Sequence, residues 1–207
     1  MNQQQDQLEA LHEIRNIMDR SSRFISLSGL SGVFAGLSAL AGAAVVKWHL
    51  SQHNIVYRND YTVSLNWGTI LFMLGVAAAV MVVALVLAVY FTARKARLNN
   101  HRVWDSKSQR LLLNLAIPLA VGGVFCALLL YHGIVYLVAP AMLIFYGLAL
   151  VNGSKYTLGD IRYLGMSEIV LGLLSSFFIG YGLLSWTIGF GVLHIVYGTL
   201  MYLKYER

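Results

Sequence analysis

Charged residues are scarce in this 207-residue chain. They make up 12% of it, against roughly 25% in an ordinary soluble protein, whereas hydrophobic residues make up 58%. So few charged side chains cannot cover the surface of a soluble domain that holds so much apolar mass. The composition therefore excludes water-soluble and disordered proteins.

Cysteine and proline are nearly absent as well. The single cysteine is Cys126, so no disulfide can form within the chain. The two prolines, Pro118 and Pro140, lie in apolar segments, where a proline can bend a helix and free backbone carbonyl groups. A Gly-rich phosphate loop with Lys, an HExxH zinc motif, a CxxC pair and a GxSxG nucleophile turn are all missing from the sequence. The chain thus carries none of these catalytic or nucleotide-binding motifs.

Long apolar stretches are what the chain has in abundance. A membrane-spanning helix needs about 20 predominantly apolar residues, and six segments meet or approach that length: 24–46, 67–92, 111–131, 134–151, 163–184 and 188–203. We expect tight hairpins around His132 and Gly133 and across Ser185 to Thr187. The sequence therefore predicts an all-α membrane protein with a six-helix transmembrane domain over residues 24–207.

The basic residues lie on one side of this predicted topology. Lys47 and Arg58 fall in the first outer loop, and the other 13 of the 15 Lys and Arg residues fall on the opposite side. Because cytoplasmic loops are enriched in Lys and Arg, both termini are predicted to be cytoplasmic. The net charge of +6 then reflects topology and attraction to anionic lipid, and nucleic acid is excluded as a partner.

Residues 1–23 are predicted to form a cytoplasmic amphipathic segment. Leu8, Leu11, Ile14 and Met18 recur at three- to four-residue spacing over residues 6–20, which is typical of an amphipathic helix. Such a helix either lies on the inner leaflet or a partner protein, or it is a solvated extension of the first span. The pattern leaves both readings open.

The first span is rich in small residues. Gly29, Gly32 and Gly36 lie on one face, and Gly32 and Gly36 form the GxxxG spacing that lets two helices approach closely in lipid. This face either packs against another helix of the same chain or associates with a second copy or a membrane-protein partner.

Glu168 is the only acidic residue within a predicted span. An ionisable residue inside a membrane costs roughly 2.5–3.5 kcal/mol on insertion scales and is a functional candidate by default. By depth counting, we expect a polar layer in the cytoplasmic leaflet in which Glu168 binds a proton, a cation or a basic substrate. The alternative is a structural Glu that anchors the fifth span, with Arg162 as its partner. The other members of the expected layer are Asn114, Tyr146, Tyr197, Ser28 and Ser31.

His194 lies six residues from the predicted outer start of the last span. A rise of about 1.5 Å per residue, counted from the predicted span ends, places His194 more than about 10 Å from Glu168 along the membrane normal. This separation argues against a direct pair. A buried imidazole there is either a ligand or proton relay, or a histidine that packs within the bundle.

Three other histidines are predicted on the outer side. His49 and His53 are four residues apart, and His132 lies in the second outer loop. On a continuing helix the first two share a face and fit a metal site, with His132 or Asp60 completing the ligand set. The alternative is a set of surface histidines with no role. No other residue pattern indicates a cofactor.

Two stretches carry a resemblance to known sequences. The run RNIMDRSSRFISLSGLSGVFAGLSALAGA (15–43) and the ending GFGVLHIVYGTLMYLKYER (189–207) resemble multi-span membrane proteins of the bacterial inner membrane that have no function attached. The resemblance implies six spans and a bacterial inner membrane, and it assigns no site.

Three functions remain open on the sequence alone. The first is a small transporter or channel-like module centred on Glu168. The second is a non-catalytic subunit or scaffold that associates through the small-residue face of the first span. The third, less favoured, is a membrane enzyme or metal site that uses the outer histidines.

Overall fold

All the regular elements that the structure describes are helices. The computed structural model describes residues 28–53, 66–98 and 104–207. Residues 6–20, for which we predicted an amphipathic helix, lie outside this part of the chain, as do Arg58 and Asp60. The described elements are α2 (Gly29–Gln52), α3 (Trp67–Leu98), α4 (Ser106–Tyr131), η1 (Val135–Leu137), α5 (Val138–Gly153), η2 (Ser154–Tyr156), α6 (Asp160–Phe177), α7 (Gly182–Trp186), η3 (Thr187–Leu193) and α8 (His194–Tyr205).

Within the described residues, five helices are long and apolar enough to cross a membrane. They are α2, α3, α4 from Ser108, the η1–α5–η2 segment, and the continuous α7–η3–α8 helix. The protein is therefore an all-helical, membrane-embedded protein in contact with lipid. The remaining helix, α6, has 18 residues, begins at Asp160 and carries Arg162 and Glu168.

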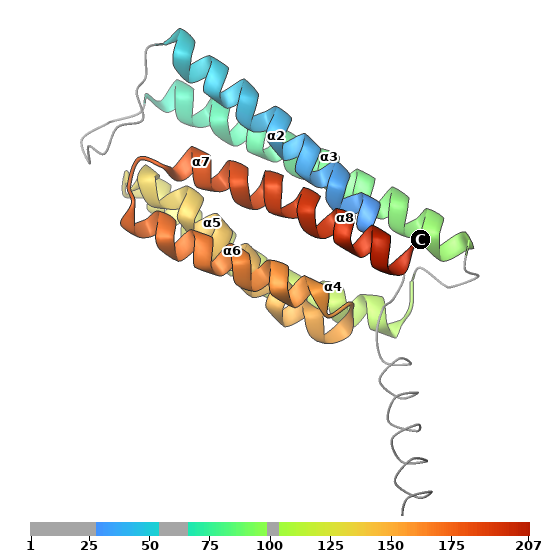
Figure 1. Cartoon of the computed structure of the whole chain (residues 1–207). Helices are drawn as coiled ribbons and strands as arrows, with labels where there is room; N and C mark the ends of the chain where they lie inside the picture. Colours follow the sequence, from blue (N-terminus) through green and yellow to red (C-terminus); the bar gives the residue numbers. More distant parts are fainter. Residues whose placement is uncertain (1–27, 54–65, 99–103) are drawn as a thin grey trace, which may run out of the picture.

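The helices form a bundle in which α7–η3–α8 lies between two groups (Figure 1). On one side α2 packs against both η3 and α8, and α3 packs against α2. On the other side α5 packs against α6 and α4, while α6 also contacts η3 and α8. The C-terminal helix consequently lies at the centre of the bundle, where it contacts helices of both groups.

Glycine allows the closest helix contacts. A Cβ on Gly147 of α5 would lie 2.5 Å from the Gly165 carbonyl oxygen of α6, and a Cβ on Gly165 would lie 2.7 Å from the Gly147 oxygen. No side chain fits at such a backbone contact. In lipid, where apolar burial drives little association between helices, van der Waals contact of this kind stabilises the pair.

The hairpin between α4 and α5 lies where the sequence predicted it. The hairpin between α6 and α7 does not. Helix α4 ends at Tyr131 and is followed by Gly133 in the left-handed region (φ 74°). The predicted turn across Ser185 to Thr187 is wrong, because α6 ends at Phe177 and the chain reverses at Gly180 (φ 100°). Phe177 to Leu184 is uniformly apolar, so hydropathy did not reveal the turn inside it.

Residues at the C-terminal end of α8 join several helices. Glu206 accepts hydrogen bonds from the Gly29 backbone N–H and the Ser28 hydroxyl at the start of α2, and its carboxylate lies 3.3 Å from Lys95 Nζ of α3. Lys204 Nζ and the Tyr205 hydroxyl both donate to Asp160 at the start of α6, at 3.1 and 2.6 Å. We call Asp160, Lys95, Lys204, Tyr205 and Glu206 the terminal clasp.

Candidate functional site

Three polar side chains from three helices meet midway between the ends of the bundle. Glu168 of α6 is fully buried at 0% exposure, and His194, the first residue of α8, is buried. His194 Nδ1 lies 3.5 Å from Glu168 Oε1, and His194 Nε2 lies 2.7 Å from the Tyr146 hydroxyl of α5. We call Glu168, His194 and Tyr146 the central triad.

The hydrogen bonds of His194 fix the position of its ring proton. Nδ1 lies 3.0 Å from the Gly189 carbonyl oxygen, and a carbonyl only accepts, so Nδ1 carries the proton in this contact. In the neutral imidazole, Nε2 is then the acceptor and the Tyr146 hydroxyl donates to it. The two ring nitrogens thus connect Tyr146 on one side with Gly189 and Glu168 on the other.

The Glu168 carboxyl group lacks a conventional hydrogen bond. Among the buried side-chain polar atoms that the structure describes, only Glu168 Oε1, Glu168 Oε2 and Ser175 Oγ have no hydrogen-bond partner. In the described regions, His194 is the one basic side chain within 4.0 Å of Glu168, so the predicted alternative anchor, Arg162, does not pair with it. A buried carboxyl group with unused acceptor positions is unusual in a folded protein and marks this point of the bundle as a candidate site.

An unusual backbone segment positions the triad. Thr187–Leu193 forms a π-helix, a wide turn that is rare and is frequent at functional sites. It contains Gly189, whose carbonyl accepts from His194 and whose α-carbon lies so close to Glu168 that an added Cβ would overlap Oε2. The wide turn and the missing side chain together leave room for the carboxyl group beside the imidazole.

The predicted separation of Glu168 and His194 is wrong. The sequence placed the sixth span at 188–203, whereas the continuous helix begins at Gly182. This shift moves His194 to the middle of its helix, and Glu168 lies near the middle of α6. The two residues therefore share one depth, and the polar cluster lies midway along the bundle instead of at one end.

Tyr197 lies beside the triad, while the other predicted members of the layer lie elsewhere. The Tyr197 hydroxyl is 3.3 Å from Oγ of Ser167, the neighbour of Glu168. Asn114 instead pairs with α5, because Asn152 Nδ2 donates to its backbone and side-chain oxygens at 2.9 and 3.2 Å. Ser28 bonds Glu206, and Ser31 donates to the Ser28 carbonyl at the end of the bundle. The residues that were predicted to form one polar layer therefore lie in three separate groups.

The three histidines predicted on the outer side do not lie together in the structure. His53 Nδ1 lies 2.9 Å from the His49 carbonyl oxygen, and the His49 ring stacks on Phe72 with centroids 3.9 Å apart. His132 follows α4 and contacts Tyr131. Within residues 28–53, 66–98 and 104–207 no three His, Cys, Asp or Glu side chains are placed to hold a metal ion. The predicted metal site stays without structural support.

The small-residue face of α2 is covered by the C-terminal helix of the same chain. A Cβ on Gly36 would lie 2.6 Å from the Gly191 carbonyl oxygen, and a Cβ on Gly32 would lie 3.1 Å from the Gly198 α-carbon. Gly29 packs equally tightly against Gly198 and Tyr202. Of the two readings of this face, packing within the chain is the one observed, so Gly29, Gly32 and Gly36 are not available to a partner.

Aromatic rings extend from the triad toward the end of the bundle opposite the terminal clasp. Phe190 in η3 lies between Trp186 and His194, with ring centroids 5.2 and 6.0 Å away, and it also contacts Tyr146 at 5.0 Å. Sequence analysis missed Phe190 and Gly189. The spacing of Trp186, Phe190 and His194, four residues apart in each step, was a signal that these three rings share one helix face.

At the end of the bundle, the electrostatics of the terminal clasp are conventional. Partial burial by itself would raise the pKa of Asp160, but the hydrogen bonds from Tyr205 and Lys204 and the Lys204 charge outweigh it, so this carboxyl pKa lies below its usual value. Glu168, by contrast, accepts no hydrogen bond.

Comparisons of the chain with protein-family models, with curated proteins and with solved structures found no match.

Proposed function

We propose that the protein is a proton-carrying transport module of the bacterial inner membrane, with the central triad as its proton site. The proposal includes six spans, with α6 as the fifth, and both termini in the cytoplasm. The observation that carries it is the Glu168 carboxyl group, fully buried and without a hydrogen bond, at 3.5 Å from an imidazole nitrogen. An ionisable group kept inside a membrane domain at a cost in stability is expected to serve a function.

The three groups supply a short path for a proton. A proton that reaches Nε2 of His194 from the Tyr146 side makes the imidazole cationic, and the proton on Nδ1 then passes to a Glu168 oxygen. The first transfer breaks the O–H bond of Tyr146 and forms the Nε2–H bond of His194, and the second breaks the Nδ1–H bond and forms an O–H bond on Glu168. Tyr146 regains its proton from the next donor along the path. Rotation of the Glu168 carboxyl group shortens the 3.5 Å gap to the roughly 2.7–2.9 Å of a charge-assisted hydrogen bond.

Gly189 and Glu168 offer His194 two alternative acceptors. In the structure, Nδ1 lies closer to the Gly189 carbonyl, at 3.0 Å, than to Glu168 Oε1, at 3.5 Å. A small movement exchanges one acceptor for the other, and only the contact with Glu168 allows a proton to pass. This choice of acceptor gives the site a resting state and a transferring state.

The charge distribution supports the proposed orientation. One end of the bundle holds every Lys and Arg among the described residues except Lys47. At this end α2, α4 and α6 begin, and α3, α5 and α8 finish. Among the residues that the structure describes, the opposite end carries Lys47 alone. This asymmetry is the one expected when the basic end faces the cytoplasm.

The test is proton flux through the purified protein. Liposomes with an internal pH-sensitive dye are given a K⁺ diffusion potential with valinomycin, and acidification is followed for wild type, Glu168→Gln and His194→Phe. We expect flux in wild type and at least about a tenfold loss in both variants. Asn114→Ala is the matched control, because Asn114 lies in the bundle outside the triad. Wild-type flux no greater than that of empty liposomes, or equal flux in Glu168→Gln, contradicts the proposal.

A further inference from the structure

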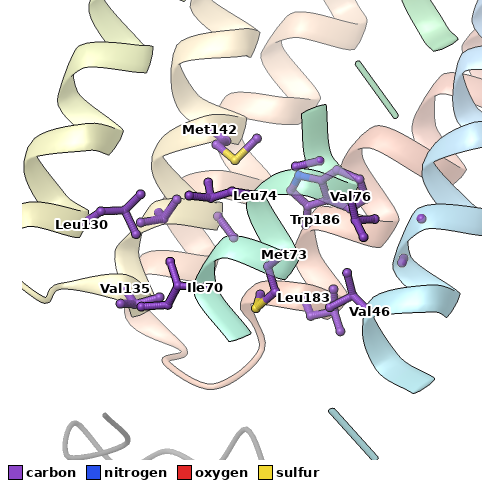
Figure 2. Close-up of a pocket in the computed structure, with 15 residues that line it drawn as sticks. Val46, Ile70, Met73, Leu74, Val76, Leu130, Val135, Met142, Leu183 and Trp186 are labelled. Carbon is purple, nitrogen blue, oxygen red and sulfur yellow. The ribbon is translucent and has the colours of Figure 1, made fainter. Parts of the chain in front are cut away.

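An apolar pocket lies between the two helix groups, toward the end of the bundle opposite the terminal clasp. Its cavity of about 100 Å³ is enclosed by α2 and α3 on one side and by α4, α5 and α7 on the other (Figure 2). The walls include Val46, Ile70, Met73, Met142 and Trp186. Its atoms are almost all apolar, and the pocket contains no charged side chain.

The pocket is continuous with the surface that faces lipid. Leu74 of α3 lines the pocket and is 42% exposed on the outside of the bundle. Helix α3 packs against α2, and α4 packs against α5. The pocket lies between these two pairs of helices. A ligand therefore reaches the pocket from the bilayer, which selects for a hydrophobic molecule, because an apolar cavity gives a polar one no hydrogen bonds.

The inner wall of the pocket leads to the central triad. Trp186 and Met142 line the pocket, and one helical turn deeper Phe190 contacts both Trp186 and Tyr146, at centroid distances of 5.2 and 5.0 Å. Tyr146 in turn bonds His194, which lies beside Glu168. Phe190, Tyr146 and His194 therefore connect the apolar pocket with the buried carboxyl group of Glu168.

These features define the charge of the ligand. Aromatic faces attract cations, most strongly once water is excluded, and three aromatic rings stand between the pocket and Glu168. Both Glu168 oxygens lack a hydrogen bond, so the low-dielectric interior offers an acceptor for positive charge. An anion would gain nothing from either feature.

We infer that the pocket binds a hydrophobic organic cation that enters from the bilayer, with its apolar part in the pocket and its charge directed toward Phe190 and Glu168. This inference rests on the proposed function, because the cation is the substrate whose movement the proton site would couple to. The cavity of about 100 Å³ is smaller than the 150 Å³ apolar cavity that binds benzene in another protein. It therefore suits a short aliphatic group, or one ring that extends into the open side of the pocket.

The probe is benzyltrimethylammonium, which has one ring and a permanent charge, and its neutral isostere is neopentylbenzene. Binding to the full chain in lipid nanodiscs is measured by equilibrium dialysis. Ala77→Phe fills the pocket from α3, and Ala79→Phe, at an exposed position on the opposite face of the same helix, is its matched control. Leu74→Trp at the exposed rim is a second obstructing variant that leaves the buried packing intact.

We expect the cation to bind wild type and Ala79→Phe equally, and to bind Ala77→Phe, Leu74→Trp and Glu168→Gln at least about tenfold more weakly. Equal binding to wild type and to both obstructing variants overturns the pocket assignment. Unchanged binding of the cation to Glu168→Gln overturns the cation assignment, as does equal affinity of wild type for neopentylbenzene and for benzyltrimethylammonium. Either result leaves a lipid chain as the occupant.

The proton-flux experiment is carried out without the ammonium probe, so the two proposals fail separately. Binding without wild-type flux overturns the proton-carrying function and keeps the pocket. Wild-type flux without binding keeps the proton site and overturns the pocket as the place where a cation is bound.

Discussion

Helix α3 and the continuous α7–η3–α8 helix are opposites in composition and in position. Helix α3 is the most apolar of the five candidate spans and the least buried, and α7–η3–α8 is the least apolar and lies at the centre of the bundle. The residues that α3 buries lie near its two ends and include Thr69 and Thr92, whereas the central helix buries four glycines, Ser185, His194 and Met201.

This difference shows that the usual relation between hydrophobicity and burial is reversed here. Lipid is as apolar as a leucine side chain, so apolar residues gain little by leaving it. Small residues gain from close backbone contact, and ionisable residues avoid the bilayer by facing the interior of the bundle. The least apolar of the five candidate spans is consequently the one that contributes His194 to the candidate site.

Glycine substitutions in the two helices are expected to give the largest contrast. Gly198→Ala places a Cβ 2.6 Å from the Val33 backbone nitrogen of α2, and Gly75→Ala in α3 meets nothing within 4 Å. We expect Gly198→Ala to lower stability by about 3 kcal/mol, a fall of roughly 6–12 °C in Tm. Gly75→Ala is expected to raise stability by roughly 0.5–1 kcal/mol through helix propensity.

Thermal unfolding in detergent, followed by circular dichroism, measures both variants against wild type. Similar Tm values for Gly198→Ala and Gly75→Ala would show that α2 and α8 are not in the close contact described.

The next contrast lies within the central helix. A Cβ on Gly189 overlaps Glu168 Oε2 and the Leu143 side chain, so Gly189→Ala is expected to destabilise by about 1–3 kcal/mol. In a Glu168→Ala background part of this loss disappears, because one of the two obstructing groups is gone. A double-mutant cycle of unfolding free energies measures the coupling, which we expect to be at least about 1 kcal/mol. Strictly additive effects would place Glu168 away from Gly189.

Much of the architecture was predictable from the sequence, because lipid imposes long apolar helices. The start of α3 at Trp67 and the turn after Tyr131 lie where they were predicted, and Gly133 marks that turn. The end of α3 was predicted at residue 92, six residues before the helix ends at Leu98. Glu168, Tyr146 and His194 were each identified as candidates, because polar groups are conspicuous in apolar spans.

The meeting of these three residues was not predictable. Apolar residues continue through the turn at Gly180, so the sequence placed the start of the last helix too late and the depth of His194 too near one end. The π-helix Thr187–Leu193 depends on packing against Glu168 and α2, which local sequence does not encode. Interhelical contacts such as Glu206 with Gly29 likewise depend on the tertiary arrangement.

A smaller effect is expected from removing the buried acid. Glu168 makes no conventional hydrogen bond, and replacing a buried charge by an apolar residue of similar volume is often neutral or stabilising. We therefore expect Glu168→Met to raise the unfolding free energy by about 1 kcal/mol while proton flux is lost. Glu206→Met in the terminal clasp is the comparison, and it is expected to lower stability because Gly29, Ser28 and Lys95 lose their contacts with the Glu206 carboxylate. Strong destabilisation by Glu168→Met would indicate a structural role.

The smallest effect concerns pH at the end of the bundle. The pKa of Asp160 is held below its usual value in the folded protein, so its contribution to stability is present above about pH 3.9 and is lost as pH falls through the folded-state pKa. Asp160→Asn is expected to lower stability at pH 7 by less than about 1 kcal/mol. Tm values of wild type and Asp160→Asn measured between pH 7 and pH 3 should converge at the acidic end, and a constant difference would contradict the ion pair with Lys204.

The most direct test of the account asks whether Glu168 and His194 exchange a proton. Infrared difference spectra of the protein in lipid, recorded across a pH titration, report the carbonyl band of a protonated carboxyl group, and Glu168→Gln identifies the band of Glu168. We expect the midpoint pH of this band to differ between wild type and His194→Phe and to be unchanged in Asn114→Ala. A Glu168 band that does not change with pH, or one with the same midpoint in wild type and His194→Phe, would contradict it.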